Sequence, residues 1–263
     1  MMPENTSRAS PPLDPAPLDP RAQRAVDRKR WMGAFNLSLA GVLLLLVVYS
    51  LQDSIDLRNW MVQPWSAIGL LGLIGAPLLH GSFDHLVANA ISLLMLGTLA
   101  GGMYPRAAAR ALPLIWLGSG LGAWLLGEPG SHHLGASGIT HGLMFLVFLL
   151  GLLRRDRPAI AAAMIAFFLY GGMLLTVFPR ELGVSWQAHL GGAVGGVLAA
   201  LLWRRLDPQP PRRKYSWELE EEQAAAEALA DSLEPPSPSE VPVLWHRPDE
   251  QERGVVLPFR RRP

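Results

Sequence analysis

Long runs of apolar residues, separated by short polar segments, dominate residues 33–205. The first run, residues 33–51, has 19 positions without a charge and would extend roughly 28 Å as a helix, close to the hydrocarbon thickness of a bilayer. Later runs predict five further helices, over residues 84–99, 107–126, 137–153, 158–178 and 188–203. The pattern therefore predicts an all-α membrane protein built as a bundle of six transmembrane helices.

Two apolar segments have alternative interpretations. Residues 66–79 are apolar but short and interrupted by Gly and Pro, so we expect this segment to lie in the membrane interface rather than to span. The run over residues 33–51 resembles the apolar part of a cleaved signal peptide. It is long, however, a polar leader precedes it and no Ala-x-Ala pattern follows, which favours a retained first helix.

The two ends of the chain differ from the apolar middle. Residues 1–32 are rich in Pro, Asp and Arg and have no apolar periodicity, which predicts a disordered basic leader. Residues 206–263 form a Pro-rich tail that we expect to be largely disordered, with one acidic, Ala-rich stretch over residues 217–233 that favours a single exposed helix. That tail is interpreted as solvated, with a partner-binding element as the alternative.

Composition and charge narrow the class of protein. The chain is 50% hydrophobic and 17% charged, and residues 33–203 hold only 13 of its 45 charged side chains. This distribution excludes an ordinary soluble domain. A net charge of +1 with scattered basic residues offers no face for nucleic acid. The absence of cysteine excludes disulfides, thiolate metal sites and a cysteine nucleophile, which leaves serine, histidine and carboxylate chemistry.

The basic residues predict the orientation of the helices. Arginine and lysine gather in the leader and after the second, fourth and sixth predicted helices: Arg21, Arg24, Arg28, Lys29 and Arg30, then Arg106 and Arg110, Arg154, Arg155 and Arg157, and Arg204, Arg205, Arg212, Arg213 and Lys214. The other three loops contain only Arg58 and Arg180 as basic residues. The positive-inside rule therefore puts both termini in the cytoplasm, and a bacterial inner membrane is favoured over an organellar one.

Ionisable and polar groups inside the predicted helices need partners or a wet cavity. The second, fourth and sixth helices all run inward from the outer side, and they place His85, Ser137 and His189 at similar depth near their starts. Asn89 follows His85 by four residues and shares its helical face. The fourth helix is short, roughly 25 Å, so the segment over residues 127–136 must descend into the membrane, where it would line a cavity.

Small residues predict close packing of the fourth and sixth helices. Gly138 and Gly142 form one small-xxx-small face directly after Ser137, and Gly192 and Gly196, followed by Ala200, form another after His189. Such glycines are ordinary packing residues in many membrane proteins. Their position directly beneath a serine and a histidine is what makes them informative.

Together these residues have the chemistry of acyl transfer. His189 would take the Ser137 proton, and the alkoxide would attack a carbonyl to form an acyl-enzyme that water then hydrolyses. The sixth helix contains no carboxylate to orient His189, so packing or another neighbour must hold the ring. The backbone N–H of Ser137 and the side chains of His85 and Asn89 are the candidate donors to the developing oxyanion.

Three sequence motifs resemble those of the rhomboid intramembrane serine proteases. The His-x4-His-x3-Asn pattern of that family appears as His80, His85 and Asn89, and its Gly-x-Ser-Gly as Gly135, Ala136, Ser137 and Gly138. Its Ala-His-x2-Gly-x3-Gly pattern appears as Ala188, His189, Gly192 and Gly196. The motifs fall in the expected order in the second, fourth and sixth helices, and the resemblance covers residues 33–205.

This resemblance implies a rhomboid-like bundle that cleaves transmembrane segments of other membrane proteins. Ser137 would be the nucleophile and His189 the base, with His85, Asn89 and the Ser137 amide in the oxyanion hole. His80 would be structural in the first outer loop, which would dip into the membrane. Substrates would enter sideways from the bilayer near the second and fifth helices. The partners implied are transmembrane protein substrates and the lipid bilayer, with no cofactor, metal or nucleic acid.

The sequence departs from the family pattern at two places. Family members commonly have an aromatic residue four positions after the serine that stacks on the catalytic histidine, whereas this chain has His141 there. His141 is either a helper that orients His189 or a satisfied core histidine. A Trp-Arg pair often found in the first loop is absent from the matching positions, Leu71 and Gly72, so that anchor of the loop is either replaced or missing.

Three other classes of function fit the sequence less well. The histidines His85, His132, His133, His141 and His189 raise a metal site as an alternative, but the His-Glu-x-x-His signature of intramembrane metalloproteases is missing. We expect His132 and His133 instead to be hydrated at the mouth of their loop. A transporter would show internal repeats or polar sites near the midplane, which this chain lacks. A catalytically inactive relative that binds membrane clients would lose the serine or the histidine, and both are present.

Overall fold

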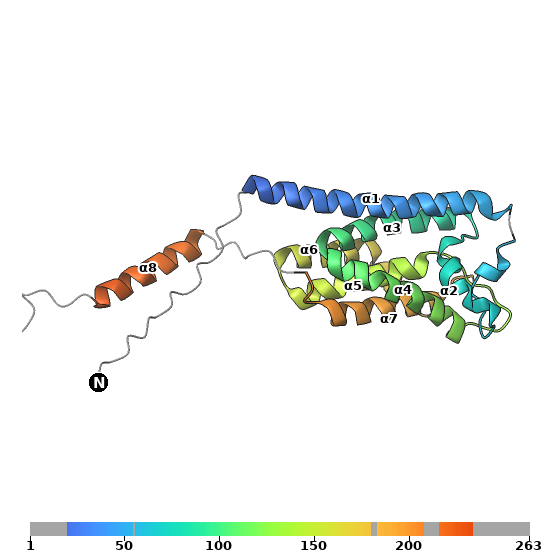
Figure 1. The fold of residues 1–263 in the computed structure, drawn as a ribbon. Helices are drawn as coiled ribbons and strands as arrows, with labels where there is room; N and C mark the ends of the chain where they lie inside the picture. The colour runs from blue at the N-terminus through green and yellow to red at the C-terminus, as the bar shows by residue number, and fades with distance from the viewer. Residues whose placement is uncertain (1–19, 55, 180–182, 208–215, 234–263) are drawn as a thin grey trace, which may run out of the picture. The chain divides into compact units, whose positions relative to one another are not determined.

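The computed structural model describes residues 20–54, 56–179, 183–207 and 216–233, in two units, Met1–Gln209 and Pro210–Pro263. Residues 1–19 of the predicted leader and residues 208–215 and 234–263 of the predicted tail lie outside the described part. In the first unit, six helices form the bundle (Figure 1): α1 (Pro20–Gln52), α3 (Phe83–Met103), α4 (Pro105–Leu126), α5 (Ser137–Arg154), α6 (Arg157–Tyr170) and α7 (Trp186–Trp203). The second unit contains helix α8 (Ser216–Leu233), whose sequence is acidic.

The lengths and composition of these helices are those of membrane spans. Five candidate spans are long and apolar enough to cross a bilayer: α1, α3, α4, α5, and α6 together with the following helical turn η4 (Gly171–Leu174). Helix α7 has 18 residues but carries Gln187 and His189 near its start and several glycines, which lower its apolar character. The described residues contain no strand beyond one isolated bridge between Val62 and His133. The protein is therefore an all-α, multi-pass membrane protein, as the apolar runs predict.

Helix α1 begins well before the expected position. It starts at Pro20, so the prediction of a disordered leader is wrong over residues 20–32. This part of the sequence consists largely of Arg, Ala, Gln and Lys, which are good helix formers. Local side-chain contacts add to this preference: the Gln23 amide donates to Asp27 at 3.2 Å, and Arg30 pairs with the same carboxylate at 3.1 Å.

The described residues between α1 and α3 form only short helical segments, none as long as the candidate spans. These segments are η1 (Arg58–Trp60), η2 (Ile68–Leu70), α2 (Gly72–Gly75) and η3 (Ala76–Leu78). Two indole N–H groups of α4 hold this loop: Trp116 donates to the Leu73 carbonyl and Trp124 to the Ser66 carbonyl, each at 3.0 Å. The loop lacks the Trp-Arg pair of the family, and these two hydrogen bonds from α4 anchor it instead.

Helix α7 lies between α4 and α5 and packs closely against both through glycine residues. A Cβ at Gly192 would overlap the Gly138 carbonyl of α5, and a Cβ at Gly196 would overlap the Gly142 carbonyl. On the opposite side, a Cβ at Gly191 would overlap the Gly118 carbonyl of α4. The backbones of α5 and α7 therefore touch, as their small-residue faces predict, and this brings the first turns of both helices together.

The fifth predicted helix is shorter than expected. Residues 158–178 were expected to form one helix, but α6 ends at Tyr170, and the chain continues through η4 and turns to Phe178. The pair Gly171 and Gly172 follows Tyr170, and glycine has a low helix propensity, which explains the end of the helix at this point. The irregular backbone that results lies against the start of α7, where it contacts His189.

Candidate functional site

Ser137 and His189 are hydrogen-bonded to each other across the contact between α5 and α7. Ser137 is the first residue of α5, and His189 lies in the first turn of α7. The Ser137 hydroxyl oxygen is 2.8 Å from His189 Nε2. His189 is 6% exposed, so the imidazole is enclosed, while Ser137 is half-buried. Residues that are 52 positions apart in the sequence therefore form a serine–histidine pair.

The other ring nitrogen of His189 faces a backbone carbonyl. His189 Nδ1 is 3.0 Å from the carbonyl oxygen of Thr176, in the irregular segment after α6. A carbonyl oxygen only accepts, so the hydrogen bond requires the proton on Nδ1. In the neutral ring, the lone pair of Nε2 then faces the Ser137 hydroxyl, which is the arrangement that a general base needs.

Sequence reasoning missed Thr176. Its contribution to His189 is a main-chain oxygen, which every residue type has, so no side-chain motif could have indicated it. The available signal was indirect: the pair Gly171 and Gly172 breaks the helix and allows the following backbone to turn toward α7.

His141 lies against the face of His189. The two rings are stacked with centroids 3.8 Å apart and an interplanar angle of 13°. His141 Nδ1 is 2.6 Å from the Ser137 carbonyl, and His141 Nε2 is 2.8 Å from the Thr176 hydroxyl. Nδ1 donates to the Ser137 carbonyl, and the Thr176 hydroxyl, which donates to the Met173 carbonyl at 3.1 Å, also lies within hydrogen-bond distance of His141 Nε2. His141 therefore joins Ser137, His189 and Thr176 in one network.

His85 and Asn89 of α3 line the opposite side of the site. Their side chains approach Gly135, where an added Cβ would lie 2.6 Å from His85 Cε1 and 3.7 Å from Asn89 Nδ2. Gly135 has φ of +112°, a conformation that side chains with a Cβ rarely adopt, so glycine is needed here for both space and backbone geometry. Asn89 is 5% exposed, and its Nδ2 has no hydrogen-bond partner among the described residues.

The start of α5 follows Gly135 and Ala136 directly in the sequence. As the first residue of that helix, Ser137 has a backbone N–H that the helical ladder leaves without a partner. Gly138 follows it in contact with α4 and α7, where a Cβ would overlap the Ser119 hydroxyl. The start of α5 thus has a half-buried serine hydroxyl, an imidazole hydrogen-bonded to it and a nearby backbone N–H, which are groups of the kind that acyl transfer uses.

His80 lies outside this set and connects α1 to the loop before α3. Its backbone forms a pair of hydrogen bonds with the Gln52 side chain, 2.7 Å from the Gln52 amide nitrogen to the His80 carbonyl and 3.2 Å from the His80 N–H to Gln52 Oε1. The His80 ring packs edge-on against His85. Burial, together with the nearby His85, lowers the pKa of His80 to about 4, against the opposing effect of the Leu78 carbonyl.

His133 differs from the expectation of a hydrated residue at the loop mouth. It is half-buried and bridges two serines, with Nδ1 at 2.6 Å from the Ser185 hydroxyl and Nε2 at 2.9 Å from the Ser131 hydroxyl. Its backbone pairs with Val62 in both directions. Burial lowers the pKa of His133, with a further contribution from His132, which is exposed. His133 thus connects three loops near the start of α7.

The buried and half-buried histidines belong to the separate groups of contacts described above. Among the described residues, no group of three or more His, Asp or Glu side chains is arranged to hold a metal ion.

Comparison with known proteins agrees with this architecture. The model of the Rhomboid domain family matches residues 63–206. The uncharacterized protein Rv1337 of Mycobacterium tuberculosis is 39% identical over 201 residues, covering 71% of this chain and 81% of that protein. Similar values hold for Mb1372 of Mycobacterium bovis, and the uncharacterized protein ML1171 of Mycobacterium leprae is 36% identical over 185 residues, covering 66% of this chain and 73% of its own length. The fold and site define a rhomboid-type multi-pass membrane protein. The chain belongs to the rhomboid family.

Proposed function

We propose that the protein is an intramembrane serine endopeptidase that cleaves transmembrane segments of other membrane proteins. The observation that carries this proposal is the 2.8 Å hydrogen bond between the Ser137 hydroxyl and His189 Nε2, with the opposite nitrogen bound to the Thr176 carbonyl. A serine beside a neutral imidazole of fixed tautomer is the arrangement that makes a hydroxyl nucleophilic.

The reaction proceeds in two acyl-transfer steps. Ser137 Oγ attacks the carbonyl carbon of the scissile peptide bond while His189 Nε2 takes the hydroxyl proton. The tetrahedral intermediate collapses, the C–N bond breaks, and the imidazolium gives its proton to the departing amine. Water then attacks the ester carbonyl carbon while His189 Nε2 takes its proton. The C–O bond to Ser137 breaks, the imidazolium returns the proton to Ser137 Oγ, and the second fragment leaves with a new carboxyl group.

Two sets of neighbours support the charges that develop. The oxyanion would receive hydrogen bonds from the Ser137 N–H and from the side chains of His85 and Asn89. The imidazolium would be stabilised through its Nδ1–H by the Thr176 carbonyl, which stands where a triad has a carboxylate. The half-buried position of Ser137 supports access for a substrate that partly unwinds near the start of α5.

The substrate class and the membrane are part of the proposal. Transmembrane segments would enter laterally between α3 and α6, and the protein would lie in a bacterial inner membrane with both termini in the cytoplasm. The distribution of Arg and Lys over the sequence supports this orientation.

Cleavage in liposomes tests the proposal. The full-length protein is reconstituted with a panel of single-span reporter proteins that differ in their transmembrane segments, and fragments are identified by mass spectrometry. We expect fragments with wild type and with the control Ser38→Ala, a buried serine of α1, but none with Ser137→Ala or His189→Ala. Equal cleavage by Ser137→Ala would contradict the assignment of the nucleophile.

A further inference from the structure

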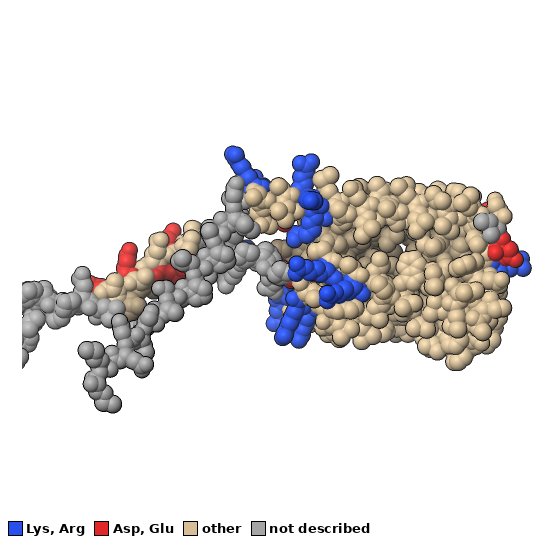
Figure 2. Space-filling model, viewed as in Figure 1, with Lys and Arg blue, Asp and Glu red and all other residues tan. Residues whose placement is uncertain are grey.

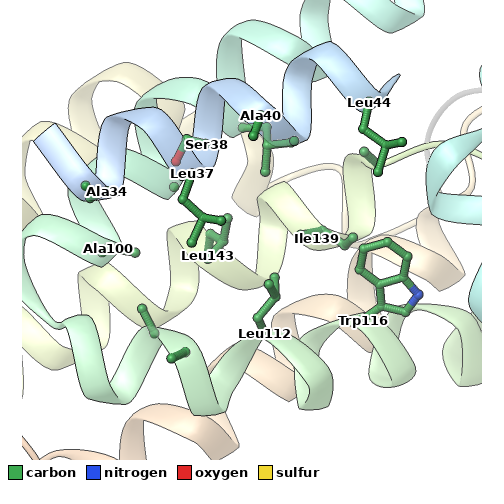
Figure 3. A pocket seen from close by; sticks show the side chains of 18 of the residues that line it. Ala34, Leu37, Ser38, Ala40, Leu44, Ala100, Leu112, Trp116, Ile139 and Leu143 are labelled. Atoms are coloured by element: carbon green, nitrogen blue, oxygen red, sulfur yellow. The ribbon is translucent and has the colours of Figure 1, made fainter. Parts of the chain in front are cut away.

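A groove of about 680 Å³ lies between α1 and the helices α3, α4 and α5, next to the contact of α1 with α3 (Figure 3). Leu37 and Leu44 of α1 and Leu112 of α4 line it and are 74%, 49% and 38% exposed. Ile139 and Leu143 of α5 form its inner wall. Such an apolar space does not hold water, and its size is that of a small-molecule site, so an apolar ligand would fill it.

The groove exists because of how α1 packs. Small residues of α1 approach glycines of α3: a Cβ at Gly101 would lie 3.0 Å from the Ala34 Cβ, and a Cβ at Gly97 would lie 2.5 Å from the Ser38 hydroxyl. This contact holds α1 on α3. The larger leucines of α1 then point toward α4 and α5 without filling the space between the helices.

One end of the groove is basic. Lys29 and Arg30 of α1 line it there, at the end of the membrane unit where Lys and Arg side chains gather (Figure 2). Asp27 pairs with Arg30, and it is the only acidic residue of α1, against five basic ones. This end therefore carries a net positive charge, which complements an anionic headgroup.

The other end of the groove lies beneath the candidate site. Pro77 and Leu78 of the loop before α3 line it, together with Ala136, the residue that precedes Ser137. Along α1, the distance from Arg30 to Leu44 is roughly 21 Å, which exceeds the thickness of one leaflet, about 15 Å. The groove, which runs toward Ala136, is therefore long enough to hold the whole acyl chain of a lipid whose phosphate lies at the basic end.

We propose that this groove binds an anionic phospholipid from the leaflet at the basic end of the bundle. Its phosphate contacts Lys29 and Arg30, and an acyl chain fills the space between α1, α4 and α5. Each basic residue near an anionic headgroup contributes about a fivefold gain in affinity, so the pair gives a preference of about 25-fold for an anionic over a zwitterionic lipid.

Native mass spectrometry of the full-length protein tests this proposal with two lipids of identical chains, phosphatidylglycerol and phosphatidylcholine, added in equal amounts. We expect wild type to retain phosphatidylglycerol preferentially and Lys29→Gln/Arg30→Gln to lose most of that preference. Arg24→Gln/Arg28→Gln removes the same charge from α1 at positions that do not line the groove, so it should keep the preference. Ala40→Trp, which fills the groove from α1, should reduce retention of both lipids.

Three results would overturn the proposal. Wild type could retain the two lipids equally, the two double variants could lose the preference to the same extent, or Ala40→Trp could bind like wild type. The readout requires no proteolysis, and Ser137→Ala is expected to bind lipid like wild type. Failure of this proposal is thus distinguishable from failure of the proposed function.

Discussion

At the scale of single residues, the site uses a main-chain oxygen where a triad uses a carboxylate. The Thr176 carbonyl fixes the tautomer of His189, and the Thr176 hydroxyl contacts His141, so one residue of an irregular segment positions both rings. A neutral carbonyl stabilises the imidazolium less than a carboxylate does, but it can be buried without the large cost of desolvating a charge. This suits a site inside a membrane protein.

The stacking of His141 on His189 predicts a difference between two substitutions. His141→Phe keeps the ring contact, worth about 0.5–1.5 kcal/mol, although it loses the bonds to Ser137 and Thr176. His141→Ala loses the contact as well and frees His189 to move, for which we expect a fall in the cleavage rate of about 10²-fold. The rates of reporter cleavage measure this. Identical rates for the two variants would show that His141 contributes nothing through its ring.

The residues of the site were predictable to different degrees. Motif spacing indicated Ser137 and His189, since a serine and a histidine beside glycine faces require a particular pattern of side chains. The role of His141 stayed open, because the family has a stacking aromatic residue at this position and a histidine there fits either a helper of His189 or a satisfied core residue. Thr176 was not predictable, because its carbonyl leaves no mark on the sequence. The hydrogen bonds of His133 were not predictable, since one of its partners, Ser185, comes from a distant loop.

At the scale of elements, α7 depends on backbone contact on two sides. Gly191 and Gly195 face α4, whereas Gly192 and Gly196 face α5, so few large side chains separate the three helices. Close backbone approach gives van der Waals contact in place of a hydrophobic driving force, which is weak between helices in lipid. The same contact fixes the distance between Ser137 and His189.

Adding one methyl group at this contact tests its importance. Gly192→Ala would overlap the backbone of Gly138, and we expect a loss of stability of about 1–3 kcal/mol together with lower activity. Gly33→Ala is the matched control, because nothing lies within 4 Å of a Cβ there and alanine favours the helix. Thermal unfolding in detergent measures both. Equal melting temperatures for the two variants would show that α5 and α7 can separate at no cost.

The lowered pKa of His80, in the loop before α3, predicts that the stability of the protein depends on pH. Because the pKa of His80 is lowered from its ordinary value of 6.5 to about 4, the unfolded chain binds a proton there more readily than the folded one. The contribution of His80 is fully present above pH 6.5 and is lost as the pH falls toward 4. His80→Phe removes this titration and keeps the backbone bonds to Gln52. When the pH is lowered from 7.5 to 5, the melting temperature should fall less in His80→Phe than in wild type. An equal fall in both proteins would show that His80 does not contribute to the pH dependence.

At the scale of the whole molecule, apolar runs and charge distribution predict the bundle well. The lengths of α3, α4, α5 and α7 follow the runs within a few residues, because each span is limited by polar or charged residues at both ends. Two boundaries were missed because polarity does not mark them. The charged segment over residues 21–30 consists largely of good helix formers and continues the helix of the apolar run toward Pro20, and nothing charged marks the end of α6 at Tyr170.

The proposed orientation can be measured with single cysteines, since the chain has none of its own. Glu128→Cys lies in the loop between α4 and α5, and Arg205→Cys follows α7 at the basic end. In intact bacterial cells with a permeabilised outer membrane, a membrane-impermeant maleimide should label the first and not the second. The reverse pattern would contradict the orientation with cytoplasmic termini.

In the proposed mechanism, His189 activates Ser137. A fluorescent fluorophosphonate reacts with activated serines and needs no knowledge of the substrate, so we would label purified full-length protein and locate the modified peptide by mass spectrometry. We expect labelling at Ser137 in wild type and in Ser38→Ala, and its loss in both Ser137→Ala and His189→Ala. A folded wild type without label, or a label that persists in Ser137→Ala, would contradict it and favour a family member that binds membrane clients without cleaving them.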